Sequence, residues 1–286
     1  MPAKTIDGIA LANKLKQKVK DDVLGLKDEG IAPGLAVVMV GENPASKVYV
    51  TRKQVSCEEV GIHSEKTEFT ENVDEATVIK KISELNSRND IHGILVQLPL
   101  PQHLNEKKIL QTVFPEKDVD GFHVVNSGEL YYGENLLVPN TSRGIIALIK
   151  STGEKIEGKH AVVVGRSKVV GKPTAMLLLQ ENATVTVCHT KTKNLPDFTR
   201  EADILVVATG VPHLISAEML KKSAIVIDVG ITRMVNGKFI GDVDFEGVKE
   251  VAGWISPAPG GVGPMTVACL MENTVKTCRM QTGALD

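Results

Sequence analysis

Hydrophobic residues recur along the chain in two alternating patterns, one with helical spacing and one in short unbroken runs. Within residues 8–26 the apolar positions recur at helical spacing among Lys and Asp: Ile9, Ala12, Leu15, Val19 and Val23. This spacing predicts an amphipathic helix. The run at 35–40 is short and rich in β-branched residues, which is typical of a strand buried on both faces of a parallel sheet. The chain therefore opens with a helix and a buried strand.

The first half continues this alternation and then becomes irregular. We predict a helix from Ser46, as its N-cap, to about Val60, a second helix over 74–86 and a strand over 91–96. Residues 114–144 are rich in loops and glycine and predict no long element. A domain boundary is expected in this stretch or in the helix just after it, near 144–150.

The second half begins the same rhythm again. We predict four strands, at 160–164, 184–188, 204–208 and 224–228, and two helices, at 172–182 and 264–280. Alternating strands and helices indicate a mostly parallel, doubly wound sheet. The predicted fold class is therefore α/β, with two domains that each hold a mostly parallel sheet flanked by helices, the second of them Rossmann-like.

Composition excludes several classes of protein. The chain has 286 residues, 42% hydrophobic and 24% charged, with a formal net charge of −2, so a disordered chain is not expected. The charge leaves no basic surplus for nucleic acid or an anionic membrane, and 3% aromatic residues argue against a stacking platform for single strands. No apolar run approaches the roughly 18 residues that span a bilayer.

The beginning of the sequence shows neither a signal peptide nor an organelle presequence. Residues 1–7 lack an apolar core, no arginine precedes Arg52, and acidic residues occur early. We therefore expect a cytoplasmic protein. The four cysteines, Cys57, Cys188, Cys269 and Cys278, form no CxxC pair and have no His at metal-ligand spacing, which indicates unlinked thiols in a reducing compartment and no metal site.

A glycine loop joins the strand at 160–164 to the next helix. Gly165 and Gly171 bracket five residues there, and backbone amides at a helix N-terminus suit a phosphate group. The spacing is not GxGxxG, so an ordinary glycine turn explains it equally well. Gly210 and Gly230 also end strands, where glycine permits close approach of a ligand or simply forms a tight turn.

The charge around this loop favours NADP over NAD. NAD-binding folds place an acid about 20 residues after the loop, at the end of the second strand. Here that strand ends in His189 and Thr190, and Arg166 follows the first glycine. Arg166 and Thr190 suit a 2′-phosphate; the alternative is that Arg166 is a solvated loop arginine.

A second group of candidate residues lies in the first half. Ser46, Tyr49 and Lys53 share one face of a predicted helix. Lys53 is either a solvated helix lysine or, in a closed cleft, a base whose pKa burial has lowered. Gln97 ends a buried strand, where its amide can bond such a lysine. Asp118 and Asp120 precede Gly121 and either form a turn or bind a polar heterocycle.

Five ordered segments together resemble the methylenetetrahydrofolate dehydrogenase/methenyltetrahydrofolate cyclohydrolase family over nearly the whole chain. They are Ser46-x-x-Tyr49-x-x-x-Lys53, Gly93-Ile-Leu-Val-Gln97-Leu-Pro-Leu-Pro101, Lys117-Asp-Val-Asp120-Gly121, Gly165-Arg-Ser-x-x-Val-Gly171-x-Pro173 and Pro259-Gly-Gly-Val-Gly-Pro-Met-Thr266. The resemblance implies NADP-dependent oxidation of 5,10-methylenetetrahydrofolate and hydrolysis of the methenyl product to 10-formyltetrahydrofolate, a step that serves purine biosynthesis.

The resemblance also implies a domain division and an assembly. Residues 1–145 plus 268–286 would form the folate-binding catalytic domain, and 146–267 the NADP-binding domain. The partners would be tetrahydrofolate derivatives and a second copy of the chain, in a homodimer formed mainly through the cofactor domain.

Roles for individual residues follow from the same resemblance. Lys53 would be the central catalytic residue, Tyr49 would pack on the folate, Gln97 would tune Lys53, and Asp120 would anchor the pterin. The remaining folate-binding positions would be Leu98, Pro259, Gly260 and Gly261. The cofactor-binding positions would be Thr141, Gly165, Arg166, Ser167, Gly171, His189, Thr190, Gly210, Gly230 and Ile231.

One segment departs from the family. Pro139-Asn-Thr-Ser-Arg-Gly144 stands where the family usually has Pro-Cys-Thr-Pro-x-Gly, so Asn140 and Ser142 replace a Cys and a Pro. This loop lies near the nicotinamide in the family, so the alternative is a dehydrogenase whose cyclohydrolase activity is weak or lost. A folate- or nucleotide-binding protein without turnover and a shikimate-type dehydrogenase are the other interpretations.

The hydrolytic step makes a prediction about Lys53. Water attacks a cationic carbon of the methenyl-folate, and only a neutral lysine can take the proton without repelling that cation. We therefore predict a lowered pKa for Lys53.

Overall fold

The computed structural model describes residues 2–134, 136–234, 237 and 239–284, which form two compact units. One unit, called the 13–140 unit, comprises Asn13–Asn140 and Val267–Asp286. The other, called the 141–266 unit, comprises Met1–Ala12 and Thr141–Thr266. Residues 1–12, expected in the first domain, group with the second because strand β1 (Lys4–Thr5) pairs in parallel with β11 (Trp254–Ile255).

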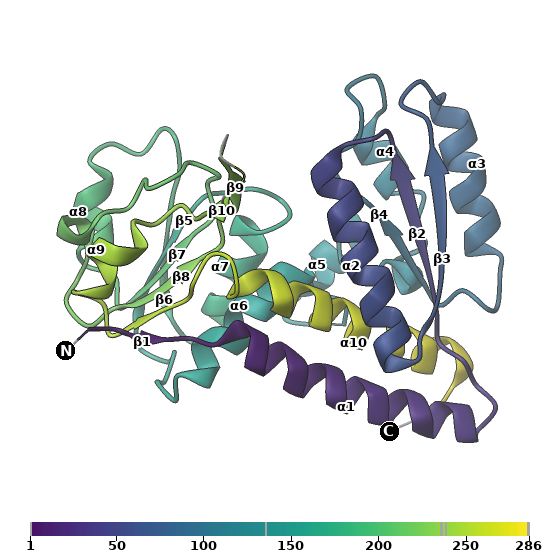
Figure 1. Ribbon diagram of the computed structural model, residues 1–286, viewed down its shortest axis with the longest axis horizontal. Coiled ribbons are helices and arrows are strands. Elements are labelled where there is room, and N and C mark those ends of the chain that lie inside the picture. Colours follow the sequence, from purple (N-terminus) through teal and green to yellow (C-terminus); the bar gives the residue numbers. More distant parts are fainter. Residues whose placement is uncertain (1, 135, 235–236, 238, 285–286) are drawn as a thin grey trace. The chain divides into compact units, whose positions relative to one another are not determined.

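The 13–140 unit is built around a three-stranded parallel sheet in the order β3-β2-β4 (Figure 1). Its strands are β2 (Gly34–Val40), β3 (His63–Phe69) and β4 (Gly93–Val96). Every residue of the central β2 is buried, because helices cover both faces of the sheet. This arrangement explains the unbroken apolar run in the sequence.

Alternate residues of β2 enter two separate cores. Leu35, Val37 and Met39 pack with helices α1 (Gly8–Asp28), α2 (Pro44–Val60) and α10 (Val262–Thr282). Ala36, Val38 and Val40 pack on the other face with α3 (Glu75–Asn86) and α4 (Glu106–Leu110). The pleat of one strand therefore joins two helical layers.

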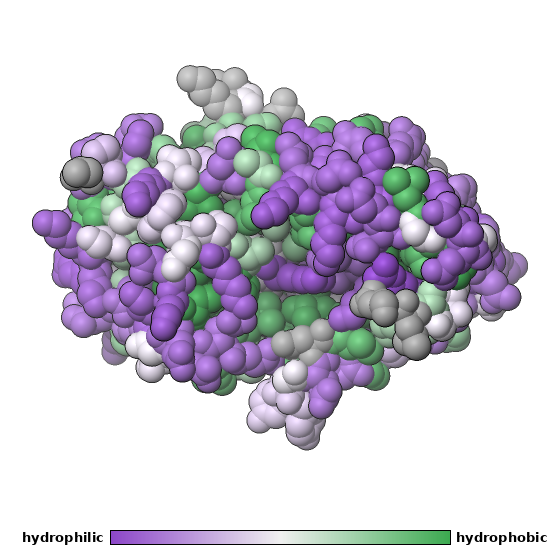
Figure 2. Space-filling model, turned by 90° about the horizontal axis from the view of Figure 1, so that it is seen from below, coloured by the Kyte–Doolittle hydropathy of each residue, from purple (hydrophilic) through white to green (hydrophobic). Residues whose placement is uncertain are grey.

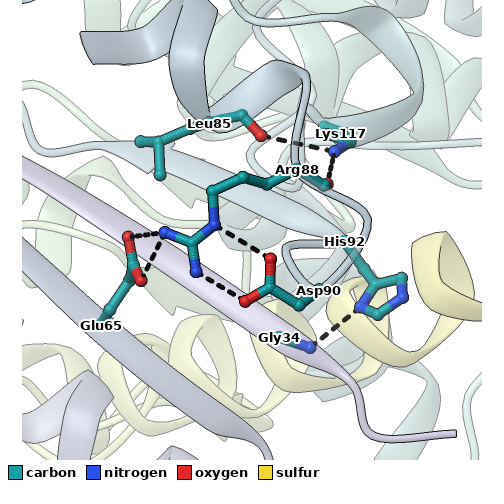
Figure 3. Close-up of polar contacts among 7 residues, drawn as sticks. All are labelled: Gly34, Glu65, Leu85, Arg88, Asp90, His92 and Lys117. Carbon is teal, nitrogen blue, oxygen red and sulfur yellow. Dashed lines mark hydrogen bonds and ion pairs between the residues drawn. The ribbon is translucent and has the colours of Figure 1, made fainter.

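A polar cluster holds the amino ends of these strands together (Figure 3). The Arg88 guanidinium donates to both carboxylate oxygens of Glu65, at 2.9 and 2.8 Å, and to both oxygens of Asp90, at 2.9 and 2.6 Å. Buried Lys117 donates from Nζ to the backbone carbonyls of Arg88, at 2.6 Å, and Leu85, at 3.4 Å. These bonds satisfy carbonyls at and beyond the end of α3.

The same cluster positions the segment that follows Lys117. Asp118 forms a parallel bridge with Ile94 of β4, and its carboxylate accepts from the His123 backbone N–H at 2.7 Å and from Asn126 Nδ2 at 2.9 Å. A short 3₁₀ turn (Pro115–Lys117) leads into it. Asp118 is therefore a structural residue that fixes the chain two positions before Asp120.

The 141–266 unit has a six-stranded, all-parallel sheet in the order β1-β11-β8-β7-β5-β6. Its four longer strands are β5 (His160–Val164), β6 (Thr184–Cys188), β7 (Ile204–Val207) and β8 (Ile225–Asp228). The order reverses at β5, which has β6 on one side and β7 on the other, and this point is where open α/β sheets bind ligands. The flanking elements are α6 (Asn140–Ser151), α7 (Gly171–Gln180), α8 (Leu195–Thr199), α9 (Phe245–Lys249) and the hairpin β9 (Thr232–Arg233) with β10 (Phe239–Ile240).

Several predicted elements are confirmed, and three predictions need correction. The strands at 160–164 and 184–188 have the predicted bounds. Within the stretch expected to be loops, α5 (Val124–Tyr132) forms a helix that ends at Gly133, whose φ is +90°. Strand β3 was not predicted, because its sequence is polar and charged and it lies at the sheet edge. Ser46 does not cap α2; its backbone N–H donates to Asn43 Oδ1 at 3.2 Å, and the helix begins at Pro44.

The surface and the helices agree with the composition. Figure 2 shows a face on which hydrophilic residues cover wide areas and hydrophobic residues gather in smaller patches between them. Of the helices in the described part of the chain, none is both long and apolar enough to cross a membrane. Among the same residues, no group of three or more His, Cys, Asp and Glu is placed to hold a metal ion.

Replacing Lys117 tests the polar cluster. We expect Lys117→Met to lower the free energy of unfolding by about 1–3 kcal/mol, because two buried carbonyls lose a charged donor. Urea unfolding measures the loss, and amide hydrogen exchange in α3 and β4 locates it. Lys107→Met, on the exposed face of α4, is the matched control and should stay within about 0.5 kcal/mol. Equal effects of the two variants would contradict the assignment.

Candidate active site

Helix α2 and the end of β4 bring a buried amine and a side-chain amide together. Lys53 is 9% exposed, and its Nζ donates to Gln97 Oε1 at 3.0 Å. Gln97 follows β4, where its backbone N–H donates to the Val38 carbonyl at 2.8 Å. Its Nε2 donates to the Leu98 carbonyl at 2.7 Å. Because that carbonyl needs a donor, the amide oxygen must face Lys53, and the lysine is held by a fixed acceptor.

Burial shifts the pKa values of both ionisable groups at this site. Burial lowers the pKa of Lys53, and the charge of Asp120 opposes this effect. Burial likewise raises the pKa of Asp120, against the charge of Lys53. Each group is thus moved toward its neutral form, since a buried charge loses its hydration. The direction for Lys53 is the one that the hydrolytic chemistry predicts.

Two further residues of this site come from nearby segments. Tyr49 lies one helical turn before Lys53 on α2 and is half-buried. Asp120 precedes Gly121, whose φ is +69° and whose missing Cβ would lie 2.8 Å from the Pro139 nitrogen. Only glycine allows this close passage, so the turn carries Asp120 against the start of α6. Tyr49, Lys53, Gln97, Leu98 and Asp120 therefore all belong to the 13–140 unit.

The glycine loop after β5 depends on two close backbone approaches. A Cβ on Gly165, whose φ is +124°, would overlap the Ala208 carbonyl at the end of β7, and a Cβ on Gly171 would overlap the Gly165 carbonyl. Ser167 Oγ accepts from the backbone N–H groups of Val170, at 3.1 Å, and Gly171, at 3.3 Å. The loop therefore folds tightly onto the N-terminus of α7, as a phosphate cradle requires.

The end of β6 carries no acid, as the sequence predicts. His189 Nδ1 accepts from the Lys191 backbone N–H at 3.1 Å, and the backbone N–H of His189 donates to Thr192 Oγ1 at 2.9 Å. Thr190 and Arg166 are exposed side chains on the two neighbouring strand ends, since β5 and β6 are paired. This arrangement fits a phosphate on the adenosine ribose.

Asp242 is a residue of this sheet edge that the sequence did not single out. Its Oδ2 accepts from the backbone N–H groups of Thr209, at 2.6 Å, and Gly210, at 2.9 Å, and a Cβ on Gly230 would overlap its Oδ1. Asp228 accepts from the Gly230 N–H at 3.0 Å, and burial raises its pKa to about 6. The two predicted glycine turns are thus shaped by aspartates. No spacing in the sequence distinguishes Asp242 from an ordinary loop acid.

The remaining predicted positions lie in the 141–266 unit. Thr141 Oγ1 accepts from Thr266 Oγ1 at 3.2 Å, which ties the start of α6 to α10. Gly260, with φ of +110°, follows Pro259, and the backbone of Gly261 passes so close to Gly8 that a Cβ there would overlap it. Ile231, just after Gly230, is 36% exposed. A folate role for Pro259, Gly260 and Gly261 stays a prediction.

The fold and these two sites define a class of protein. The sheet reversal, the glycine loop and the helix N-terminus are typical of a nicotinamide-dinucleotide-dependent dehydrogenase. The other unit holds a buried lysine whose pKa is lowered. Among residues 139–282 the chain matches the family model "Tetrahydrofolate dehydrogenase/cyclohydrolase, NAD(P)-binding domain", and over residues 6–120 it matches the catalytic domain of the same family. The chain belongs to the tetrahydrofolate dehydrogenase/cyclohydrolase family.

Individual relatives agree over nearly the full length. The "Bifunctional protein FolD" of Listeria innocua is 55% identical over 274 residues, 96% of each chain, and that of Bacillus cytotoxicus is 50% identical over 279 residues, 98% of each. The crystal structure of the bifunctional FolD enzyme from Campylobacter jejuni has a TM-score of 0.95 at 46% identity, covering 97% of this chain and 99% of that one.

A second solved structure bears on the cofactor. The methylenetetrahydrofolate dehydrogenase-cyclohydrolase of Trypanosoma brucei, complexed with NADP and an inhibitor, has a TM-score of 0.96 at 36% identity and covers 99% of this chain and 100% of that one. The present enzyme oxidises 5,10-methylenetetrahydrofolate with NADP and hydrolyses the methenyl product to 10-formyltetrahydrofolate. The glycine cradle, together with Arg166 and Thr190, fits NADP.

The protonation of Lys53 is directly measurable. We expect the Lys53 amine to titrate below the usual lysine pKa of about 10.4, because burial destabilises its charged form. NMR of protein labelled at the lysine side chains follows the titration, and Lys53→Arg identifies the signal. Exposed Lys47 on the same helix is the internal reference. A normal pKa for Lys53 would contradict its role as a base.

The glycine loop predicts a sharp steric effect. Gly171→Ala places a Cβ against the Gly165 carbonyl, so we expect the dissociation constant for NADP to rise at least about tenfold, as overpacking costs about 1–3 kcal/mol. Fluorescence titration with NADPH measures it. Gly128→Ala in α5, where a Cβ meets open space, should bind NADPH as the unaltered protein does.

Proposed function

We propose that Lys53 is the general base of the hydrolytic step, with Gln97 as its orienting acceptor and Asp120 as the folate anchor. The observation that carries this proposal is the contact between Nζ of the buried Lys53 and Gln97 Oε1 at 3.0 Å. A lysine on a solvated helix face would bond water. Here burial favours the neutral amine, which can accept a proton from an attacking water.

In the oxidation step the protein mainly positions its reactants. NADP, when bound, supplies the hydride acceptor. Hydride leaves the methylene carbon as a folate nitrogen donates its electron pair to that carbon, so this chain needs no covalent nucleophile. We assign Tyr49 to packing against the folate ring, because it shares one face of α2 with Lys53. Asp120, a carboxylate, suits two N–H groups of the pterin.

In the hydrolysis step the protein handles one proton. Water adds to the cationic methenyl carbon, the C=N π electrons move onto nitrogen, and the water proton passes to the Lys53 amine. The hydroxyl proton of the adduct then moves to the departing folate nitrogen as that C–N bond breaks and the formyl C=O forms, and Lys53 releases its proton to solvent. Gln97 keeps that amine in place through its oxygen, whether Lys53 carries two or three protons. A charged Lys53 would repel the cationic substrate, so the lowered pKa serves both binding and catalysis.

The cofactor roles and the assembly are parts of the same proposal. Arg166, Ser167 and Thr190 would receive the phosphates of NADP, with Thr141, His189, Gly210, Gly230 and Ile231 beside the rest of the cofactor. Arg166 and Thr190 support this assignment because they are exposed at adjacent strand ends. The domain division at 145/146 and 267/268, the homodimer and the cytoplasmic location stay predictions, as does a contribution to purine biosynthesis.

A spectroscopic assay with 5,10-methylenetetrahydrofolate tests the roles. With NADP⁺ we expect NADPH to form without accumulation of methenyl-folate, and NAD⁺ to work less well. Lys53→Met should abolish hydrolysis of added methenyl-folate, because no base remains. Lys47→Met, an exposed lysine on the same helix, is the matched control and should retain both activities.

Two outcomes would overturn parts of the assignment. Persistent methenyl-folate with the unaltered protein would mean that the 139–144 segment has cost the cyclohydrolase activity. Full hydrolysis by Lys53→Met would remove Lys53 from the role of base.

A further inference from the structure

Asn140, one of the two departures from the family pattern, is buried at the first residue of α6. Its Nδ2 donates to Asp120 Oδ1 at 2.9 Å and to the Val119 carbonyl at 3.0 Å. Its side chain therefore contacts the proposed folate anchor directly.

A second buried amide decides how Asn140 is oriented. Asn273 Nδ2, on α10, donates to Asn140 Oδ1 at 2.9 Å, to the Val119 carbonyl at 3.0 Å and to the Val138 carbonyl at 3.2 Å. Since Asn140 Oδ1 accepts from an N–H, its own NH₂ must face Val119 and Asp120. The two amides thus hold the segment before Gly121 in place, and all the residues that make these bonds belong to the 13–140 unit.

We propose that Asn140 is a positioning residue for folate recognition, which holds the Asp120 carboxylate ready for the pterin by a hydrogen bond from its amide. This inference rests on the proposed role of Asp120. The ligand is the one proposed for Asp120, a reduced folate whose heterocyclic N–H groups donate to the carboxylate. Asn140 acts through Asp120 and is not itself a catalytic residue.

The amide supplies what the neighbouring lysine cannot. The groups that act on Asp120 are Lys53 from α2, Asp118 two residues earlier and Asn140 from α6. Lys53 favours a charged Asp120 only while it is itself charged, and as a base it must spend part of the cycle neutral. Asp118 opposes the charge. The Asn140 N–H does not titrate, so it stabilises the carboxylate in either state of Lys53. A thiol at this position would be a much weaker donor.

The sign of the pH effect follows. A hydrogen bond from Asn140 favours the charged form of Asp120 and lowers its pKa, whereas burial raises it. Removing the donor therefore raises the pKa further. As the pH falls, activity that needs the Asp120 carboxylate will then be lost at a higher pH than in the unaltered protein.

The test compares two buried asparagines that each donate to an aspartate. Asn140→Ala should raise KM for 5,10-methylenetetrahydrofolate about tenfold, with a smaller change in kcat, and move the acidic limb of kcat/KM upward by about 1 pH unit. Asn140→Asp, which keeps the shape and the acceptor for Asn273 but places a carboxylate beside Asp120, should be more severe. Asn126→Ala is the matched control: it removes the 2.9 Å bond to Asp118 and should lower stability without raising KM or moving the acidic limb upward.

Three controls keep the outcomes distinct. NADPH binding by each variant shows that the 141–266 unit is folded. Asn140→Cys introduces the residue that the family usually has and loses little volume. Its KM should lie between those of the unaltered protein and Asn140→Ala. Equal KM values and pH profiles for Asn140→Ala and Asn126→Ala would overturn the positioning role. If Asp120→Asn leaves folate affinity unchanged, the proposed function of Asp120 fails as well. A loss in Asp120→Asn without one in the Asn140 variants refutes only this inference.

Discussion

The site depends on the cost of burying an amine and a carboxylate in the same small region. Water would stabilise both charges, and its exclusion moves the pKa values of Lys53 and Asp120 toward their neutral forms. The protein limits this cost with groups that do not titrate: the Gln97 amide for Lys53 and the Asn140 amide for Asp120. In the proposed mechanism this amine accepts a proton from water, beside a carboxylate that holds the folate.

The rest of the 13–140 unit keeps these groups in place. Gln97 follows β4, whose backbone is bonded to the buried β2. At the opposite end of the sheet, Lys117 Nζ donates to the Arg88 carbonyl (Figure 3) and so fixes the segment that continues to Asp118 and Asp120. In the 141–266 unit the corresponding constraint is steric. Gly165 and Gly171 let the backbone approach itself so closely that a phosphate can reach the start of α7.

Much of this organisation was predictable from local patterns. Buried parallel strands have continuous apolar runs, so the strand at 160–164 was predicted with its observed bounds. The edge strand at 184–188 was also predicted with its bounds, because it is rich in β-branched residues. Helix α5 was missed because its sequence contains Gly128 and few periodic apolar positions. Strand β3 was missed because an edge strand tolerates charge, and Ser46 was taken for the N-cap because Asn43 and Ser46 offer the same capping chemistry.

The sequence by itself determined the α/β class, the glycine loop and, through five ordered segments, the family, its reaction and NADP as the cofactor. These features reside in residue types at short spacings, which local chemistry constrains. Only the tertiary structure decided that Lys53 is buried against Gln97, that Asn140 and Asn273 bond the segment carrying Asp120, and that Asp242 shapes two glycine turns. These hydrogen bonds join residues 20–154 positions apart in the sequence, because the packing of helices on a sheet brings distant positions together. No local sequence pattern predicts such pairs.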